Sequence, residues 1–278
     1  MQQGADNKLV LGKCGKQARK VDARTVDIGH YFKKEMLPKP PATCDWTAKV
    51  TRPWGMMQND VLRDCTSAAA AHQAVCWTAN ATGAVINIPD DAVVDAYKAV
   101  AGYVPGDEST DNGAAELDML NYWRKTGIGG HTIMAYATVE YSNHNIVKQC
   151  IYLFGGLYTG LLLPNSIFGQ EIWDVPEGGP INQGEPGTYG SHAVVALAYD
   201  DTHVTVISWG KAVKLTWAFW DTYCDEAYAC LSADFLKKNR SPEGVELHLL
   251  EKDLLNITGE KKPILQQLAE ASGNKAYR

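Results

Sequence analysis

Cys65 and His192 are the residues whose types and settings best fit nucleophilic catalysis. Cys65 opens an alanine-rich stretch, residues 66–77, that has high helix propensity, with Asp64 in the position of an N-cap. At the first turn of a helix, unpaired backbone N–H groups and the helix dipole favour an anion and so lower the pKa of a thiol. The sequence therefore predicts that Cys65 is a thiolate nucleophile.

His192 is the candidate base for this thiol. The nearer His72 follows the cysteine by seven residues, roughly 10 Å along the same helix at about 1.5 Å per residue, so it cannot serve the thiol directly. His192 instead heads the apolar stretch 193–199, directly after a glycine-rich loop, and a strand there would hold its imidazole firmly. The next predicted strand ends with Ser208 and Trp209, which places a hydroxyl to orient the ring and an indole to shield it.

The elements that must position this pair divide the chain into a helical part and a β-rich part. Alanine content, apolar spacing and turn residues predict helices over residues 64–77, 90–100 and 114–125. β-branched and aromatic residues predict strands over residues 132–141, 151–163, 192–199 and 203–209. Residues 165–190 are rich in Pro and Gly and are expected to form a binding loop along one wall of the site.

This order of elements resembles that of papain-like cysteine peptidases, whose cysteine opens a central helix in a helical half and whose histidine lies in a β-rich half. The separation of Cys65 and His192, 192 − 65 = 127 residues, is close to the roughly 130 residues of that family. Trp209-Gly210 resembles the end of the family's Asn-Ser-Trp-Gly motif, and Asp45-Trp46 resembles the start of its mature chain. The resemblance covers about residues 44 to 235.

The resemblance also implies an oxyanion hole, formed in the family by a glutamine side chain and the backbone N–H of the catalytic cysteine. Counting six residues back from the cysteine gives Asn59, whereas counting twelve forward from Trp46 gives Gln58. Both side chains have the right chemistry. Residues 59–66 favour Asn59, because they resemble an Asn-Asp-x-x-Gly-Asp-Cys-Thr signature in a papain-like branch found in bacteria and their phages.

Two departures from the family pattern bear on activity. Residues 63–66 lack the family's disulfide cysteine and the Trp after the nucleophile, and the missing disulfide fits a reducing compartment. The position of the orienting asparagine holds Ile207 when aligned on Trp209 and Ser208 when counted from His192. Because a Ser hydroxyl orients an imidazole less rigidly than an amide does, the resemblance implies weakened activity.

The expected organisation is an α+β, papain-like fold in four parts. These are an extended lead over residues 1–43, a helical half with the nucleophile over 44–130, a β-rich half with the catalytic histidine over 131–236, and a charged tail over 237–278. The lead is short for a papain-like pro-segment, so we expect no inhibition by a pro-domain.

Composition excludes several classes of protein. The chain has 26 Lys and Arg against 32 Asp and Glu, a net charge of −6, which argues against a nucleic-acid partner. Its polar start carries no apolar signal segment, and the longest apolar run, residues 151–164, is shorter than the about 20 residues of a membrane helix. The seven cysteines show no metal-ligand spacing and are expected to be free thiols. We expect a cytoplasmic protein without a cofactor, a metal ion or membrane contact.

The leading hypothesis is a thiol hydrolase that cleaves peptide or peptide-like amide bonds through an acyl-enzyme. Its partner would be a polypeptide or a cell-wall peptide, and the phage-like signature allows association with virion proteins. A second hypothesis is a catalytically faded scaffold that acts as a structural or binding protein, as the absent asparagine would suggest. A third is a transamidase or deamidase, because an amine can resolve the acyl-enzyme as well as water can.

Overall fold

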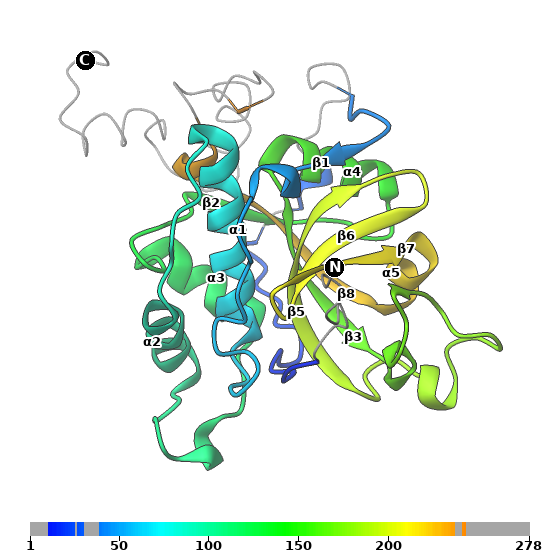
Figure 1. The fold of residues 1–278 in the computed structure, drawn as a ribbon, viewed down its shortest axis with the longest axis horizontal. Helices are drawn as coiled ribbons and strands as arrows, with labels where there is room; N and C mark the ends of the chain where they lie inside the picture. The colour runs from blue at the N-terminus through cyan, green and yellow to red at the C-terminus, as the bar shows by residue number, and fades with distance from the viewer. Residues whose placement is uncertain (1–10, 26, 31–38, 237–240, 243–278) are drawn as a thin grey trace, which may run out of the picture.

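The computed structural model describes residues 11–25, 27–30, 39–236 and 241–242. Three helices lie together beside a curled, mostly antiparallel sheet (Figure 1). They are α1 (Cys65–Thr82), α2 (Asp90–Ala101) and α3 (Glu116–Lys125). Nearly all of the predicted tail, residues 237–278, lies outside the described residues.

Helix α1 lies between the other two helices and the sheet. Every residue from Cys65 to Ala81 is buried, because the helix packs against α2 and α3 as well as against strand β5 (Gly190–Tyr199) (Figure 1). The run of four alanines allows this close packing, since small side chains let neighbouring backbones approach. The helix ends at Gly83, whose φ of 79° is left-handed, as is typical of a helix C-terminus.

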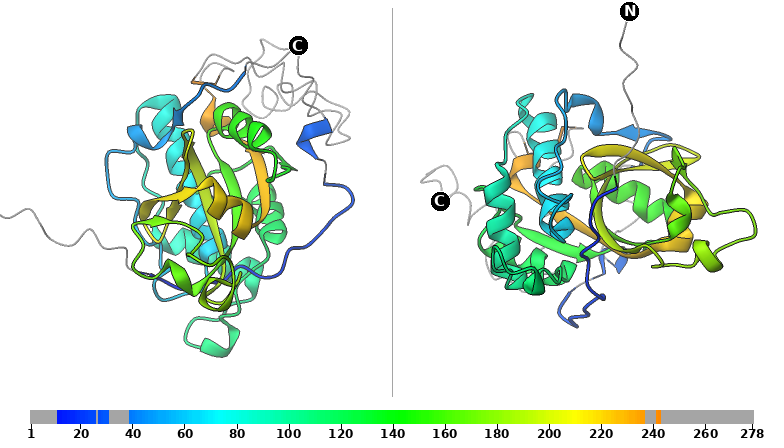
Figure 2. Two further views of the ribbon diagram at one scale, coloured as in Figure 1. Left: turned by 90° about the vertical axis from the view of Figure 1, so that its right-hand side faces the viewer. Right: turned by 60° about the horizontal axis from the view of Figure 1, so that its bottom comes forward.

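The sheet order is β2-β8-β3-β5-β6-β7-β4, and the short β1 also pairs with β5. All pairs are antiparallel except β4 with β7. The remaining strands are β1 (Cys44–Asp45), β2 (Ala135–Thr138), β3 (Leu157–Leu163), β4 (Ile172–Trp173), β6 (His203–Ser208), β7 (Lys211–Thr216) and β8 (Cys224–Leu231). Because β5 and β6 are antiparallel neighbours, the start of β5 lies beside the end of β6 (Figure 2).

The strand predicted over residues 151–163 is wrong in its first third. Residues Ile151 to Phe154 end helix α4 (His144–Phe154), and only Leu157–Leu163 form a strand. The side chain of Asn143 accepts a hydrogen bond from the backbone N–H of Ile146 and so caps the helix. The strand predicted over residues 132–141 is confined to Ala135–Thr138, and the other predicted strands and helices are found close to their predicted bounds. The aromatic run that begins at Trp217 forms the short helix α5 (Trp217–Tyr223).

No helix among residues 11–25, 27–30, 39–236 and 241–242 is both long and apolar enough to cross a membrane.

Candidate active site

Cys65 is the first residue of α1, and its side chain is 1% exposed. Its Sγ accepts a hydrogen bond from the backbone N–H of Ala193, at 3.4 Å, and Ala193 directly follows His192 in β5. The helix start and the strand start therefore meet at the thiol. Asp64 occupies the predicted N-cap position, although its side chain makes no capping hydrogen bond.

His192 is held by the two residues at the end of β6 and just beyond it. Its Nε2 lies 3.0 Å from Oγ of Ser208, and its ring stacks on Trp209 with the ring centroids 4.3 Å apart. Its Nδ1 is buried and has no hydrogen-bond partner within the described parts of the chain. If Ser208 accepts from the Nε2–H, Nδ1 keeps the free lone pair that a base requires. Of the two candidates for the orienting position, Ser208, which is found by counting from His192, contacts the imidazole, whereas Ile207 makes no such bond.

A small pocket joins these groups. It is lined by Met56, Asn59, Cys65, Ala68, Ala69, His72, His192, Ala193, Ile207 and Trp209. Of the two oxyanion candidates, Asn59 lines the pocket, whereas the amide of Gln58 points away and donates to Oδ2 of Asp90, at 3.0 Å. Of residues 165–190, none lines this pocket.

His72 also lines the pocket but is bonded elsewhere. Its Nε2 lies 3.0 Å from the carbonyl oxygen of Gly55, and its ring lies edge-on to Trp54. Burial lowers the pKa of His72 to about 4, so this imidazole is neutral at physiological pH. These contacts agree with the sequence-based view that His72 does not serve Cys65.

Burial keeps both members of the candidate pair neutral. It raises the pKa of Cys65 to about 12, although the backbone N–H groups of Ala193 and Gly15, which face the sulfur, act in the opposite direction. It lowers the pKa of His192 to about 3, and His72 adds to this effect. In this arrangement the site holds a thiol and a neutral imidazole rather than a thiolate–imidazolium pair.

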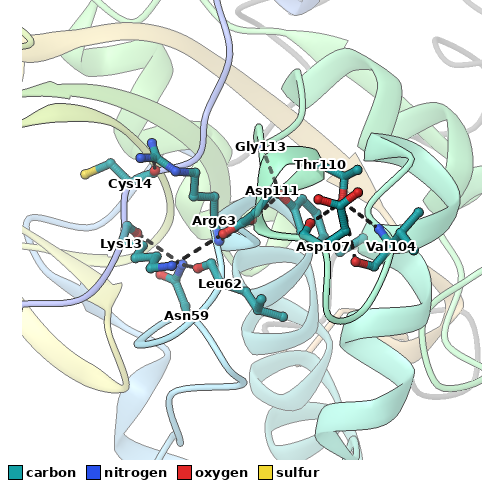
Figure 3. A network of polar contacts seen from close by, with 11 residues as sticks. Lys13, Cys14, Asn59, Leu62, Arg63, Val104, Asp107, Thr110, Asp111 and Gly113 are labelled. Atoms are coloured by element: carbon teal, nitrogen blue, oxygen red, sulfur yellow. Dashed lines mark hydrogen bonds and ion pairs between the residues drawn. The ribbon is translucent and has the colours of Figure 1, made fainter.

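Residues 11–17, here called the strap, cover the candidate pair. The strap backbone and Asn59 exchange two hydrogen bonds, from Lys13 N–H to Asn59 O at 2.8 Å and from Asn59 Nδ2 to Lys13 O at 3.1 Å (Figure 3). The indole Nε1 of Trp209 donates to the same carbonyl oxygen, at 3.3 Å. Gly12 comes so close that a Cβ on it would lie 2.4 Å from the backbone oxygen of Asn59, so this approach requires glycine.

The second part of the strap runs between the helices and the sheet (Figure 2). Lys16 N–H donates to the carbonyl oxygen of Ser191 in β5, at 3.0 Å. On the other side, the carbonyl oxygen of Gly15 accepts from Ala114 N–H, at 2.9 Å, and Gln17 N–H donates to Ala114 O, at 3.0 Å. The remaining free volume of the pocket is about 10 Å³, room for about one water molecule. A molecule larger than water can therefore reach Cys65 only when the strap has moved.

Asp64, next to the thiol, gives a pH-dependent stability prediction. Burial raises the pKa of its carboxyl group well above the usual value, and the Asn59 side chain offsets this only in part. Such a group stabilises the fold fully below its unfolded pKa, near 3.9, and loses this contribution as the pH rises through its folded pKa. Asp64→Asn, which stays neutral, should therefore gain stability relative to the parent protein by about 1.4 kcal/mol for each pH unit across that interval.

Urea unfolding of both proteins at pH 4, 5.5 and 7 would measure this difference. Asp60→Asn, at an exposed carboxyl group, is the matched control. A stability difference that stays constant between pH 4 and pH 7 would contradict the buried, protonated carboxyl group.

Among the residues that the structure describes, no group of three or more His, Cys, Asp or Glu side chains could hold a metal ion. Cys14, Cys65, Cys76, Cys150, Cys224 and Cys230 are free thiols.

Comparison with solved structures identifies the fold. Xylellain, a cysteine protease from Xylella fastidiosa, superposes with a TM-score of 0.61 at 15% identity, covering 81% of this chain and 100% of that chain. Procathepsin B from Trypanosoma congolense gives a TM-score of 0.55 at 10% identity, covering 80% and 86% of the two chains. No family model and no curated protein matches the sequence. The predicted papain-like α+β fold is thus confirmed.

Proposed function

We propose that this protein is a papain-like thiol peptidase in which Cys65 attacks the carbonyl carbon of a peptide bond and His192 acts first as base and then as acid. The observation that carries the proposal is the junction of α1 and β5, where the sulfur of Cys65 accepts the N–H of the residue after His192. A helix N-terminus favours the thiolate there. The fold shared with cysteine proteases supports the same assignment.

Three further residues fit supporting roles. Asn59 and the backbone N–H of Cys65 would stabilise the oxyanion, because the Asn59 amide already donates to a carbonyl oxygen of the strap in the same pocket. Ser208 would fix the imidazole through Nε2, the role that the amide of an asparagine has in the family that the sequence resembles. Trp209 covers the ring and excludes water from this contact.

The strap makes the proposed enzyme latent. It covers the site that the substrate must occupy, and by excluding water it keeps the pair neutral. When the strap moves away, water would enter and the cost of charging both groups would fall, so a thiolate–imidazolium pair could form. The strap would thus act as an inhibitory segment, whereas the length of the lead predicts no inhibition by a pro-domain.

The experiment that tests the proposal is a cleavage assay on a mixture of synthetic peptides, with the strap loosened by Lys16→Ala and with Cys65→Ala added as the control. We expect peptide hydrolysis that Cys65→Ala abolishes. Adding a primary amine separates peptidase from transferase, because a transamidase would form the new amide in preference to the free acid. The alternative of a faded scaffold predicts no product in any variant.

The two oxyanion candidates can be distinguished by paired variants in the Lys16→Ala protein. Asn59→Ala should lower kcat by about 10²–10³-fold, the usual effect of losing one oxyanion donor. Gln58→Ala should change kcat by less than about twofold, because Gln58 bonds Asp90 outside the pocket. Equal losses in the two variants, measured as kcat on one peptide, would contradict the assignment of Asn59.

A polypeptide or cell-wall peptide substrate and a role with virion proteins are supported by the sequence signature alone.

A further inference from the structure

The side chain of Lys16 in the strap is 0% exposed and makes two short ion pairs. Its Nζ lies 2.7 Å from Oδ2 of Asp225 and 2.7 Å from Oε1 of Glu226. Burial would lower the pKa of this ammonium group, but the carboxyl groups of Glu116, Glu226 and Asp225 outweigh the effect and raise it. The ammonium group therefore stays charged in a buried acidic pocket.

A β-bulge in β8 explains how two consecutive carboxylates reach one cation. Neighbouring residues of a regular strand point to opposite faces of the sheet. Here Gly160 of β3 pairs with Glu226, whereas Leu161 pairs with Cys224, so Asp225 is the additional residue of the bulge. A bulge redirects side chains in this way, and both carboxylates contact the same Nζ.

The pocket is shaped for a long side chain with a terminal cation. Gly160 forms part of its wall, because a Cβ there would lie 2.1 Å from Cε of Lys16. Tyr228 Oη donates to Oε2 of Glu226, at 2.7 Å, and fixes that carboxylate. Glu116, at the start of α3, is fully buried, and neither of its carboxyl oxygens has a hydrogen-bond partner within the described residues. Glu116 acts electrostatically on Lys16, so a third, unpartnered carboxyl group lies near the two that Lys16 contacts.

The acidic pocket lies beside the candidate catalytic pair. The N–H of Gly15, the residue before Lys16, faces the sulfur of Cys65. The N–H of Lys16 donates to Ser191, the residue before His192, at 3.0 Å. A peptide held between β5 and the Ala114 backbone in the same way would place one side chain in this pocket, close to the bond that Cys65 attacks.

We propose that this pocket, formed by Glu116, Gly160, Asp225 and Glu226, selects peptide substrates with a Lys or Arg side chain near the scissile bond, and that Lys16 occupies it in the resting protein. This inference rests on the proposed peptidase function. Once Lys16 has left, the carboxylates of Asp225 and Glu226 lack a counter-ion, and a basic substrate side chain that fills the pocket and excludes water again restores it. A neutral side chain leaves the carboxylates unpaired, and an acidic one adds repulsion.

The test compares kcat/KM of full-length Lys16→Ala on four peptides that differ only in one position scanned across the scissile bond, occupied by Lys, Arg, Leu or Glu. We expect the Lys and Arg peptides to be cleaved at least about tenfold better than the Leu peptide, and the Glu peptide worst. Adding Glu226→Gln should reduce the ratio of basic to Leu cleavage at least about fivefold. Glu140→Gln, at an exposed carboxylate, is the matched control and should leave the ratio unchanged.

Gly160→Ala is a second variant, which tests the pocket by filling its space rather than by removing its charge. Its methyl group would occupy the place of the Lys16 stem, so it should reduce the same ratio while both carboxylates remain. Thermal unfolding confirms that each variant is folded. The melting temperature of Lys16→Ala should also rise more with n-butylammonium chloride than with n-butanol or sodium chloride, because only butylammonium places a cation in the pocket.

The outcomes separate this inference from the proposed function. Hydrolysis of all four peptides at similar rates would overturn the acidic pocket as a specificity pocket and leave the peptidase in place. Absence of hydrolysis of every peptide, in folded Lys16→Ala with its Cys65 unreactive, would overturn the proposed function and the substrate role of the pocket together.

Discussion

Replacing Lys16 with alanine is expected to raise the rate at which iodoacetamide alkylates Cys65 by about two orders of magnitude. Reagent reaches the thiol only when the strap opens, so the rate follows the free energy of this local opening. Lys16 anchors the strap through a buried ion pair with Glu226 and a partly buried one with Asp225, and removing one partner of a buried pair costs about 3–5 kcal/mol. When the strap is open, water solvates Asp225 and Glu226, so the cost falls on the closed state.

Mass spectrometry of the peptide that contains Cys65 measures this rate separately from those of the other six cysteines. Lys20→Ala is the matched control, since Lys20 lies just beyond the strap and pairs with Asp118 at the surface. An exposed pair contributes about 0.2–1 kcal/mol, so we expect a change of less than about fivefold. Equal alkylation rates in the parent and in Lys16→Ala would contradict the strap as the barrier to the thiol.

Replacing His192 with alanine in the Lys16→Ala protein is expected to lower kcat for peptide hydrolysis by about 10³-fold or more. The substitution removes both the base that activates the thiol and the acid that protonates the leaving amine. Thermal unfolding of the double variant checks that the loss is chemical rather than structural. The kcat of a single fluorogenic peptide provides the measurement.

His72→Gln is the matched control for this prediction. His72 lines the same pocket but bonds the carbonyl oxygen of Gly55, and a glutamine amide can donate to that oxygen. We expect a loss of less than about tenfold, which is far below the effect at His192. A larger loss at His72 than at His192 would reverse the two assignments and contradict the mechanism.

The sequence predicts where the candidate pair lies because local rules determine it. The alanine run predicts α1 and the position of Cys65 at its start, and the alternation of strands brings His192 beside Ser208. The sequence alone does not decide between Asn59 and Gln58 as the oxyanion residue. Which side chain faces the pocket depends on how the loop before α1 turns. Met57 and Gln58 both have positive φ, 54° and 69°, and this turn directs the Gln58 side chain outward toward Asp90.

Helix α4 shows where the apolar pattern is ambiguous. A run of apolar and β-branched residues indicates either a buried strand or a buried helix. The helical signal lies in the spacing of Val147, Cys150, Ile151 and Phe154, all of which are buried, together with Asn143 as cap and Gly155 as end. This spacing indicates a helix up to Phe154, with the strand beginning only after it.

The strap and the acidic pocket depend on contacts between residues far apart in the sequence. Lys16 and Asp225 are separated by 209 residues, and no local pattern relates them. The only local sign of the strap in the sequence is the pair of glycines Gly12 and Gly15. A Cβ on Gly15 would lie 1.9 Å from the backbone oxygen of Arg63, so the strap can approach Arg63 this closely only because residue 15 has no side chain.

The pH dependence of Cys65 alkylation in Lys16→Ala, with and without His192→Ala, tests the central claim most directly. An activated thiolate–imidazolium pair predicts a rate that persists well below pH 7 in the presence of His192. Without His192 the rate at pH 6 should be about 300-fold below the rate of the fully ionised thiol. This is because an ordinary thiol with a pKa near 8.5 is only about one part in 300 thiolate at that pH. A rate that rises only near pH 8.5 in both proteins would contradict a catalytic pair and leave a papain-like scaffold without its chemistry.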